Sequence, residues 1–118
     1  MYLSKLTYKV AAHLPGFRQE AYFRHIHPRI TPRQAEITVN ENQSLCIAPR
    51  WDNVQRFLFL HGTYETFIQR WLARELRPGM TVVEVGANAG FYALQICRST
   101  GSEGRAVFVE PLPENFDL

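Results

Sequence analysis

One segment of the chain, residues 81–110, restricts the possible folds more than any other. The apolar run Thr81–Val85 leads into a compact turn with the sequence GANAG, and apolar residues with helical spacing cover residues 89–99. A second apolar run occupies residues 105–110. The order strand, glycine turn, helix and strand predicts a βαβ unit with two parallel strands and a right-handed crossover.

The glycine spacing of the turn narrows the choice of ligand. A helix that begins after such a turn offers unpaired N–H groups, and glycine lets a ligand approach the backbone closely. Gly86 and Gly90 have the spacing G-x-x-x-G, so the middle glycine of the dinucleotide motif G-x-G-x-x-G is missing. This disfavours an NAD-dependent oxidoreductase. The motif G-x-x-x-x-G-K-[ST] is also absent, which excludes a phosphate-binding loop of that type.

Two glutamates beside the turn favour a cofactor that carries a ribose and an ammonium group. Glu110 lies 24 positions after Gly86, where an acid accepts hydrogen bonds from ribose hydroxyls. Glu84 lies two residues before Gly86, where a carboxylate suits an ammonium better than a phosphate. S-adenosyl-L-methionine has both groups and no phosphate. A structural role stays open for each residue: a structural partner for Glu84, a cap on the next turn for Glu110, and turn geometry for the glycines.

The segment VVEVGANAGFYALQI resembles the cofactor motif of class I S-adenosylmethionine-dependent methyltransferases, and a wider pattern is similar to the FkbM family. Members of that family show G-x-Y/W-E, then V/D-x-G-A-N-x-G, then E-P-x-P-x-N-F. These segments match Gly62-Thr63-Tyr64-Glu65, residues 84–90 and residues 110–116 of this chain. Glu84 stands where aspartate is commoner in the family.

The resemblance implies an α/β chain that holds the start of a Rossmann-like class I methyltransferase fold, preceded by helices and a small β-hairpin. It implies O-methylation of a small-molecule or sugar hydroxyl with S-adenosyl-L-methionine as the cofactor. The implied cofactor-binding residues are Glu65, Glu84, Gly86, Asn88, Gly90 and Glu110. No catalytic residue is assigned, because His61, the most obvious base, precedes the Gly62 turn at a helix end, where a structural role is favoured.

The family fold has a seven-stranded sheet, and only its first two parallel strands are expected in residues 81–118. The later strands of the family supply the residues that hold adenine, the methyl acceptor and any base. We therefore expect a fragment with weak cofactor binding and no methyltransferase activity of its own. Because parallel strands are normally covered on both faces, we also expect Val107 and Val109 to be poorly covered and the sheet to self-associate.

The first 80 residues divide into a basic helical arm, residues 1–35, and a segment of hairpin and helices, residues 36–80. Within the arm we expect one helix over residues 2–14, ended by Pro15-Gly16, and a second over residues 17–26. Pro28 and Pro32 are expected to break the chain after it.

Alternating apolar residues predict a hairpin over residues 36–48, with residues 40–43 in its turn and one buried face. Asp52 is expected to cap the next helix in a capping box with Gln55, and Gly62 is expected to end it. Thr63 then precedes the clearest amphipathic pattern of the chain, a predicted helix over residues 64–76 that Thr63 caps.

Positive charge is concentrated in the basic arm. Among residues 1–35, six lysines and arginines stand against a single acid, Glu20, which leaves a net charge of +5. Such an arm can contact nucleic acid or an anionic membrane surface, but its cations form no block, so a solvated helical face is favoured and no nucleic acid is expected. The alternative function is a non-catalytic binding module that uses this arm and the amphipathic helices.

The remaining features predict a cytoplasmic protein. Cys46 and Cys97 lie in apolar segments and are expected to be small buried residues in a reducing compartment. His13, His25 and His27 show no metal-binding spacing. No apolar run is long enough for a signal peptide or a membrane span.

Overall fold

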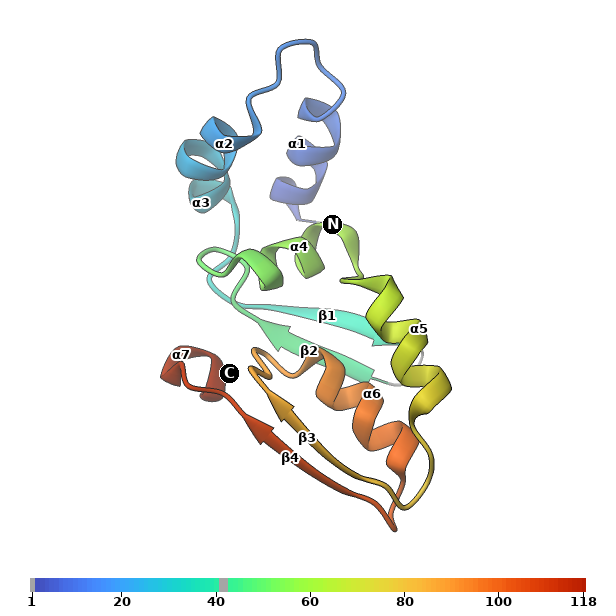
Figure 1. Ribbon diagram of the computed structural model, residues 1–118. Helices are drawn as coiled ribbons and strands as arrows, with labels where there is room; N and C mark the ends of the chain where they lie inside the picture. Colours follow the sequence, from blue (N-terminus) through green and yellow to red (C-terminus); the bar gives the residue numbers. More distant parts are fainter. Residues whose placement is uncertain (1, 41–42) are drawn as a thin grey trace.

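The computed structural model describes residues 2–40 and 43–118 and shows a mixed α/β chain with two small sheets. In space, the short N-terminal helices at one end of the molecule are followed in successive layers by one further helix, a two-stranded hairpin, another helix and a second two-stranded sheet (Figure 1). The molecule is elongated, with extents of 50 × 28 × 22 Å. The predicted α/β class is confirmed.

Short helices form the first layer: α1 (Leu3–Ala11), α2 (Gln19–Ala21), the π-helical turn η1 (Tyr22–Ile26) and α3 (His27–Ile30). The helix expected over residues 2–14 is therefore shorter than predicted. The expected break at Pro28 is wrong, because Pro28 lies in the first turn of α3. At that position the missing N–H of proline costs no helical hydrogen bond.

The predicted hairpin is formed by β1 (Ala35–Asn40) and β2 (Gln43–Ile47), which pair antiparallel with Ile37 opposite Leu45. Its inward side chains share the main hydrophobic core with Phe59 and Phe91, which come from helices further along the chain. Because strand residues alternate between faces, one face is buried as predicted. Residues 41–42 of the expected turn lie outside the described residues.

The next helix, α4 (Asn53–His61), packs on the hairpin and begins and ends as predicted. The Asp52 carboxylate accepts a hydrogen bond from the backbone N–H of Gln55 at 2.8 Å. Gly62 adopts the left-handed φ of 74° that closes the helix. The sequence therefore determines both ends of α4 through local hydrogen bonding.

The second half of the predicted capping box is wrong. The Gln55 side chain does not return to Asp52 but accepts from the N–H of Ala48 at 2.5 Å and donates to Asn115 Oδ1 at 2.7 Å. Gln55 is fully buried, and its amide there satisfies two polar groups that lie far apart in the sequence.

The amphipathic helix α5 (Thr66–Glu75) begins two residues later than expected, and Thr63 does not cap it. The Thr63 hydroxyl instead accepts from Gln69 Nε2 at 2.9 Å. Glu65 takes the N-cap position with a φ of 43°, which turns the chain sharply into the helix. Of the predicted apolar stripe, Leu72 is buried, whereas Phe67 and Trp71 are exposed.

The predicted βαβ unit consists of β3 (Thr81–Val85), α6 (Phe91–Thr100) and β4 (Arg105–Val109), and β3 pairs parallel with β4. The short helix α7 (Pro113–Phe116) follows and starts at Pro113, as expected. α6 lies between the parallel pair and the hairpin (Figure 1). The other face of the pair leaves four valines exposed: Val83, Val85, Val107 and Val109.

The prediction of two buried cysteines is wrong, since both thiols are free and exposed. Cys46 alternates along β2 with Leu45 and Ile47, and those two side chains occupy the inner face of the hairpin. Cys97 follows the buried Ile96 on α6 and therefore points away from the core.

Candidate functional site

The glycine turn joins β3 to α6 and is fastened to the end of β4. The backbone N–H groups of Gly86 and Ala87 both donate to the carbonyl of Val109, at 2.7 and 3.1 Å. Gly86 has a φ of 84°, and no atom lies within 4 Å of the place where a Cβ would stand. The backbone at Gly86 is therefore open to a ligand, and its conformation disfavours a larger side chain.

Glu110 follows β4 directly and binds three N–H donors. Its Oε2 accepts from the backbone N–H of Asn88 at 2.7 Å, and its Oε1 accepts from the N–H of Leu112 at 3.0 Å and from Asn115 Nδ2 at 3.4 Å. The Leu112 bond, followed by those from Asn88 and Asn115, holds the pKa of Glu110 below its usual range. Glu110 is thus a charged, preorganised acceptor that caps the next turn and also contacts the glycine turn.

Asn88 connects the glycine turn to α4. Its Nδ2 donates to Asp52 Oδ2 at 3.2 Å, and its Oδ1 accepts from the N–H of Ala89 at 2.8 Å. Its φ of 51° lies in the left-handed region that asparagine tolerates better than most residues. A turn of this shape therefore favours asparagine between the two glycines.

Glu84 lies on the covered face of β3 and is half-buried. Its Oε2 has no hydrogen-bond partner among the described residues. Burial raises the pKa of the Glu84 carboxyl above its ordinary value. An unpaired buried carboxylate oxygen is costly, so a positively charged donor that reached Glu84 would be bound favourably.

Glu65 reaches the same side of the unit from the start of α5. Its Oε2 accepts a hydrogen bond from the hydroxyl of Tyr92, on α6, at 2.9 Å. Burial, the bond to Glu65 and the negative charges of Glu65 and Glu84 together raise the pKa of Tyr92 far above its ordinary value. Burial and Glu65 raise the pKa of Tyr64 as well. Both tyrosines are therefore neutral donors.

Four carboxylates surround the glycine turn: Asp52, Glu65, Glu84 and Glu110. The ion pairs in the described part of the chain are Arg24–Glu20 and Arg74–Glu75, and neither involves this group. Arg56 lies close enough to Asp52 for the two charges to interact, and the remaining excess of negative charge attracts cations and hydroxyl donors and repels phosphate. The electrostatics agree with the sequence argument against a pyrophosphate cofactor.

A cavity of about 370 Å³ lies beside the turn, between α6, β2 and α7. Three of the predicted site residues line it, namely Asn88, Gly90 and Glu110, together with apolar neighbours such as Phe108 and Phe116. The other three predicted site residues, Glu65, Glu84 and Gly86, do not line this cavity. The structure thus brings the predicted residues to one turn but divides them between two sides of it.

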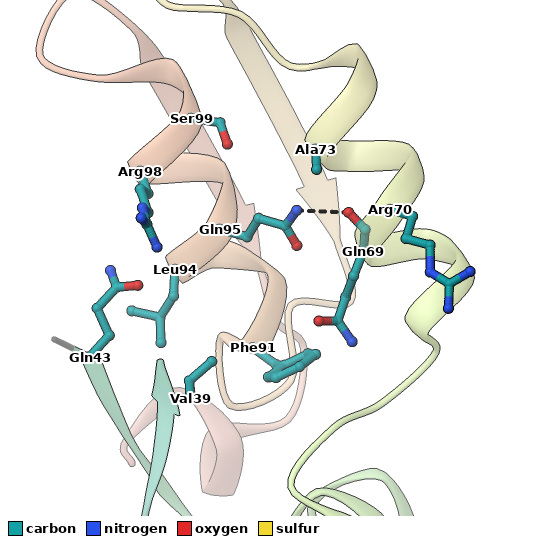
Figure 2. A pocket seen from close by; sticks show the side chains of 10 residues that line it. All are labelled: Val39, Gln43, Gln69, Arg70, Ala73, Phe91, Leu94, Gln95, Arg98 and Ser99. Atoms are coloured by element: carbon teal, nitrogen blue, oxygen red, sulfur yellow. Dashed lines mark hydrogen bonds between the residues drawn. The ribbon is translucent and has the colours of Figure 1, made fainter. Parts of the chain in front are cut away.

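A second cavity of about 420 Å³ lies between the hairpin, α5 and α6. Figure 2 shows Gln95 bridging to the backbone of Gln69 across it, with Arg70 and Arg98 at its margins. It contains none of the predicted site residues. We therefore identify the cavity beside the glycine turn as the candidate site.

Sequence reasoning missed three participants: Asp52 as a partner of Asn88, Tyr92 as a partner of Glu65, and Asn115 as a partner of Glu110. Asp52 and Tyr92 lie far in the sequence from their partners, so no local spacing joins those pairs, whereas Asn115 stands five positions after Glu110 in the segment E-P-x-P-x-N-F. His61 is exposed at the end of α4 and stacks on Phe57 with ring centroids 4.2 Å apart. It does not line the candidate cavity.

Comparison with known proteins supports a methyltransferase in general terms. Protein-L-isoaspartate O-methyltransferase 1 of Arabidopsis thaliana is 42% identical over 43 residues. These residues are 36% of this chain and only 19% of that protein. No family model matches the chain, and no solved structure is significantly similar to it. The resemblance to the FkbM family in particular gains no support from these comparisons.

Proposed function

We propose that this chain contributes cofactor-binding residues to an S-adenosylmethionine-dependent methyltransferase of the FkbM type, which methylates a hydroxyl of a small molecule or sugar. The observation that carries the proposal is the meeting of the glycine turn and Glu110 at the carboxyl ends of two parallel strands, beside a cavity. Ligands of open α/β sheets bind at this edge. The partial identity to a methyltransferase supports methyl transfer in general terms.

The residues present fit the chemical groups of S-adenosyl-L-methionine. Glu84 has an unpaired buried oxygen that suits the ammonium of the methionine part. Glu110 uses three of its roughly four acceptor positions within the chain and keeps capacity for a ribose hydroxyl. The open backbone at Gly86 admits the ligand, and Asn88 and Gly90 shape the turn.

S-adenosyl-L-methionine, when bound, supplies an electrophilic methyl group on a positively charged sulfur. The contribution of this chain is to hold that cofactor in a fixed orientation. The four carboxylates around the turn favour its positive charges. Tyr64 and Tyr92, beside Glu65, stay protonated and so remain hydrogen-bond donors. We assign no catalytic base.

Titration calorimetry of the chain with S-adenosyl-L-methionine tests the proposal. We expect weak but measurable binding, and Gly86→Val should abolish it because the new side chain fills the approach to the backbone. Gly79→Val is the matched control. Gly79 has nearly the same φ, 82° against 84°, and equally open surroundings, but it lies at the other end of β3. It carries the same backbone strain without touching the site.

Two results would contradict the assignment. One is the absence of any heat of binding in the unmodified chain. The other is an equal loss of affinity in Gly86→Val and Gly79→Val, which would make the effect one of folding. Parallel titration with NAD examines the rival dinucleotide reading, for which we expect no binding.

A further inference from the structure

The helix α1 has its apolar side on the outside of the molecule. Leu3, Leu6 and Val10 are 60%, 43% and 58% exposed, whereas Ser4 is fully buried. A period of 3.6 residues places the three apolar side chains on one side of the helix. Leu14, just beyond the helix, is 58% exposed as well. This is the reverse of the usual arrangement for a surface helix.

Specific contacts fix α1 in this orientation. The Tyr22 hydroxyl lies 3.1 Å from the carbonyl of Ser4 and 2.9 Å from the hydroxyl of Thr7. The ring of Tyr8 packs against Phe17 and Phe23, with centroids 6.2 and 5.5 Å apart. Rotating the apolar side inward would break all of these contacts. The outward orientation of the apolar face is therefore fixed by the packing of the N-terminal helices.

The N-terminal segment that carries this face is positively charged. Lys9 is exposed on α1, and Arg18, Arg24 and Arg29 are exposed on the segment that follows. The one acid of residues 1–35, Glu20, is paired with Arg24 at 3.5 Å. This segment combines an apolar helix face with exposed cations and has almost no acid to compete with them. Such a segment is complementary to a surface that has an apolar interior beneath a negatively charged outer layer.

We propose that α1 binds the surface of an anionic lipid bilayer, with Leu3, Leu6, Val10 and Leu14 inserted among the acyl chains. Lys9 and the neighbouring arginines then contact the lipid phosphates. No described helix is long and apolar enough to cross a membrane, so the contact is peripheral. A helix this short inserts few side chains, which makes the binding reversible and sensitive to salt. The proposal does not rest on the proposed function.

Co-sedimentation of the full chain with vesicles tests this. Vesicles of phosphatidylcholine with phosphatidylserine should bind the chain, and vesicles of phosphatidylcholine alone should bind it much less. Replacing Leu6 and Val10 by Gln should lower binding to the anionic vesicles about tenfold or more, because two inserted apolar side chains are lost. Lys9→Gln should lower it about fivefold, and added salt should do the same.

Phe67→Gln is the matched control, because Phe67 is an exposed apolar residue on α5, far from the basic arm in sequence. Binding that is absent, equal for both vesicle types, or unchanged in the Leu6–Val10 variant overturns the proposal. A dimer seen by sedimentation without lipid, and dissociated by the same two substitutions, also overturns it and assigns the face to a second copy of the chain. Circular dichroism of each variant checks that the fold is retained.

Discussion

At the scale of single residues, Glu110 joins two turns through one carboxylate, and we expect Glu110→Gln to destabilise the chain by about 1–3 kcal/mol. An amide places an N–H group against at least one of the three donors that Glu110 now accepts. Urea unfolding at neutral pH measures the change. Glu114→Gln changes an exposed neighbour on α7 and should leave the free energy of unfolding almost unchanged. An equal loss of stability in Glu114→Gln would show that the hydrogen bonds of Glu110 are not the cause.

Because the pKa of Glu110 is lowered in the folded chain, the stabilisation that Glu110 provides decreases as the pH falls. A carboxyl with a folded pKa below its unfolded value stabilises the fold above the unfolded pKa. That stabilisation disappears as the pH falls through the folded pKa. The difference in stability between the unmodified chain and Glu110→Gln should therefore shrink in acid.

His27 is fully buried, and neither ring nitrogen has a hydrogen-bond partner among the described residues. Burial, followed by the charges of Arg56 and Arg50, lowers its pKa to about 4. A histidine with a lowered pKa contributes stability that is complete above about pH 6.5 and lost as the pH falls toward 4. We expect a loss of about 3 kcal/mol over that interval.

Urea unfolding across this pH interval measures the effect of His27. The packed rings of Tyr22 and Phe23 form an apolar wall beside it, so His27→Leu should retain the fold. The variant should lose the steep acid dependence. An unchanged slope in His27→Leu would assign the acid sensitivity to other groups.

The sequence predicted that residues of the candidate site lie close together where those residues belong to one motif. Gly86, Gly90 and Glu110 follow from the geometry of a parallel βαβ unit, in which the carboxyl ends of both strands meet at one edge. The bond from Asn88 to Asp52 did not follow, because its partners lie 36 positions apart on separate elements. The exposure of Cys46 follows from the alternation of β2, in which Leu45 and Ile47 face inward, and not from the apolar character on which the prediction of a buried thiol rested.

At the scale of elements, α4 depends on Asp52 at both its start and its contact with the glycine turn. Asp52→Ala removes the bond to Gln55 and the bond from Asn88. We expect a loss of about 1–2 kcal/mol, the usual cost of a lost N-cap, and thermal unfolding measures it. Asn53→Ala, at the next and more exposed position, is the control and should change stability by less than about 0.5 kcal/mol.

Element types were more predictable than element ends. Gly62 ends α4 and Pro113 starts α7 through the backbone conformation of the residue itself, so the predicted end of α4 and the predicted start of α7 were both confirmed. The start of α5 was not, because Glu65 adopts a left-handed conformation that sequence pattern does not reveal. The expected break at Pro28 was also wrong, because the π-helical turn η1 runs directly into α3 and Pro28 lies in the first turn of α3.

At the scale of the whole molecule, the outer face of the β3–β4 pair exposes four valines in adjacent register. We propose that this face drives self-association, because an apolar sheet surface with open edges favours pairing. Sedimentation should show an oligomer that Val83→Lys combined with Val107→Lys converts to a monomer. Trp51→Lys, at an apolar position elsewhere that is more exposed than either valine, should leave the oligomer intact. A monomer at every concentration would refute this.

The buried amide of Gln55 links the hydrogen bonding of Ala48 to the position of α7. One end of this side chain binds the N–H of Ala48, and the other binds Asn115, 67 positions beyond Ala48 in the sequence. Hydrogen bonds in such a chain strengthen one another. When α7 detaches, the Gln55 side chain loses the bond to Asn115 that helps to fix it, so its bond to the Ala48 N–H should weaken and that amide proton should exchange faster. Hydrogen exchange at the amide of Ala48 should therefore report whether α7 is packed against α4.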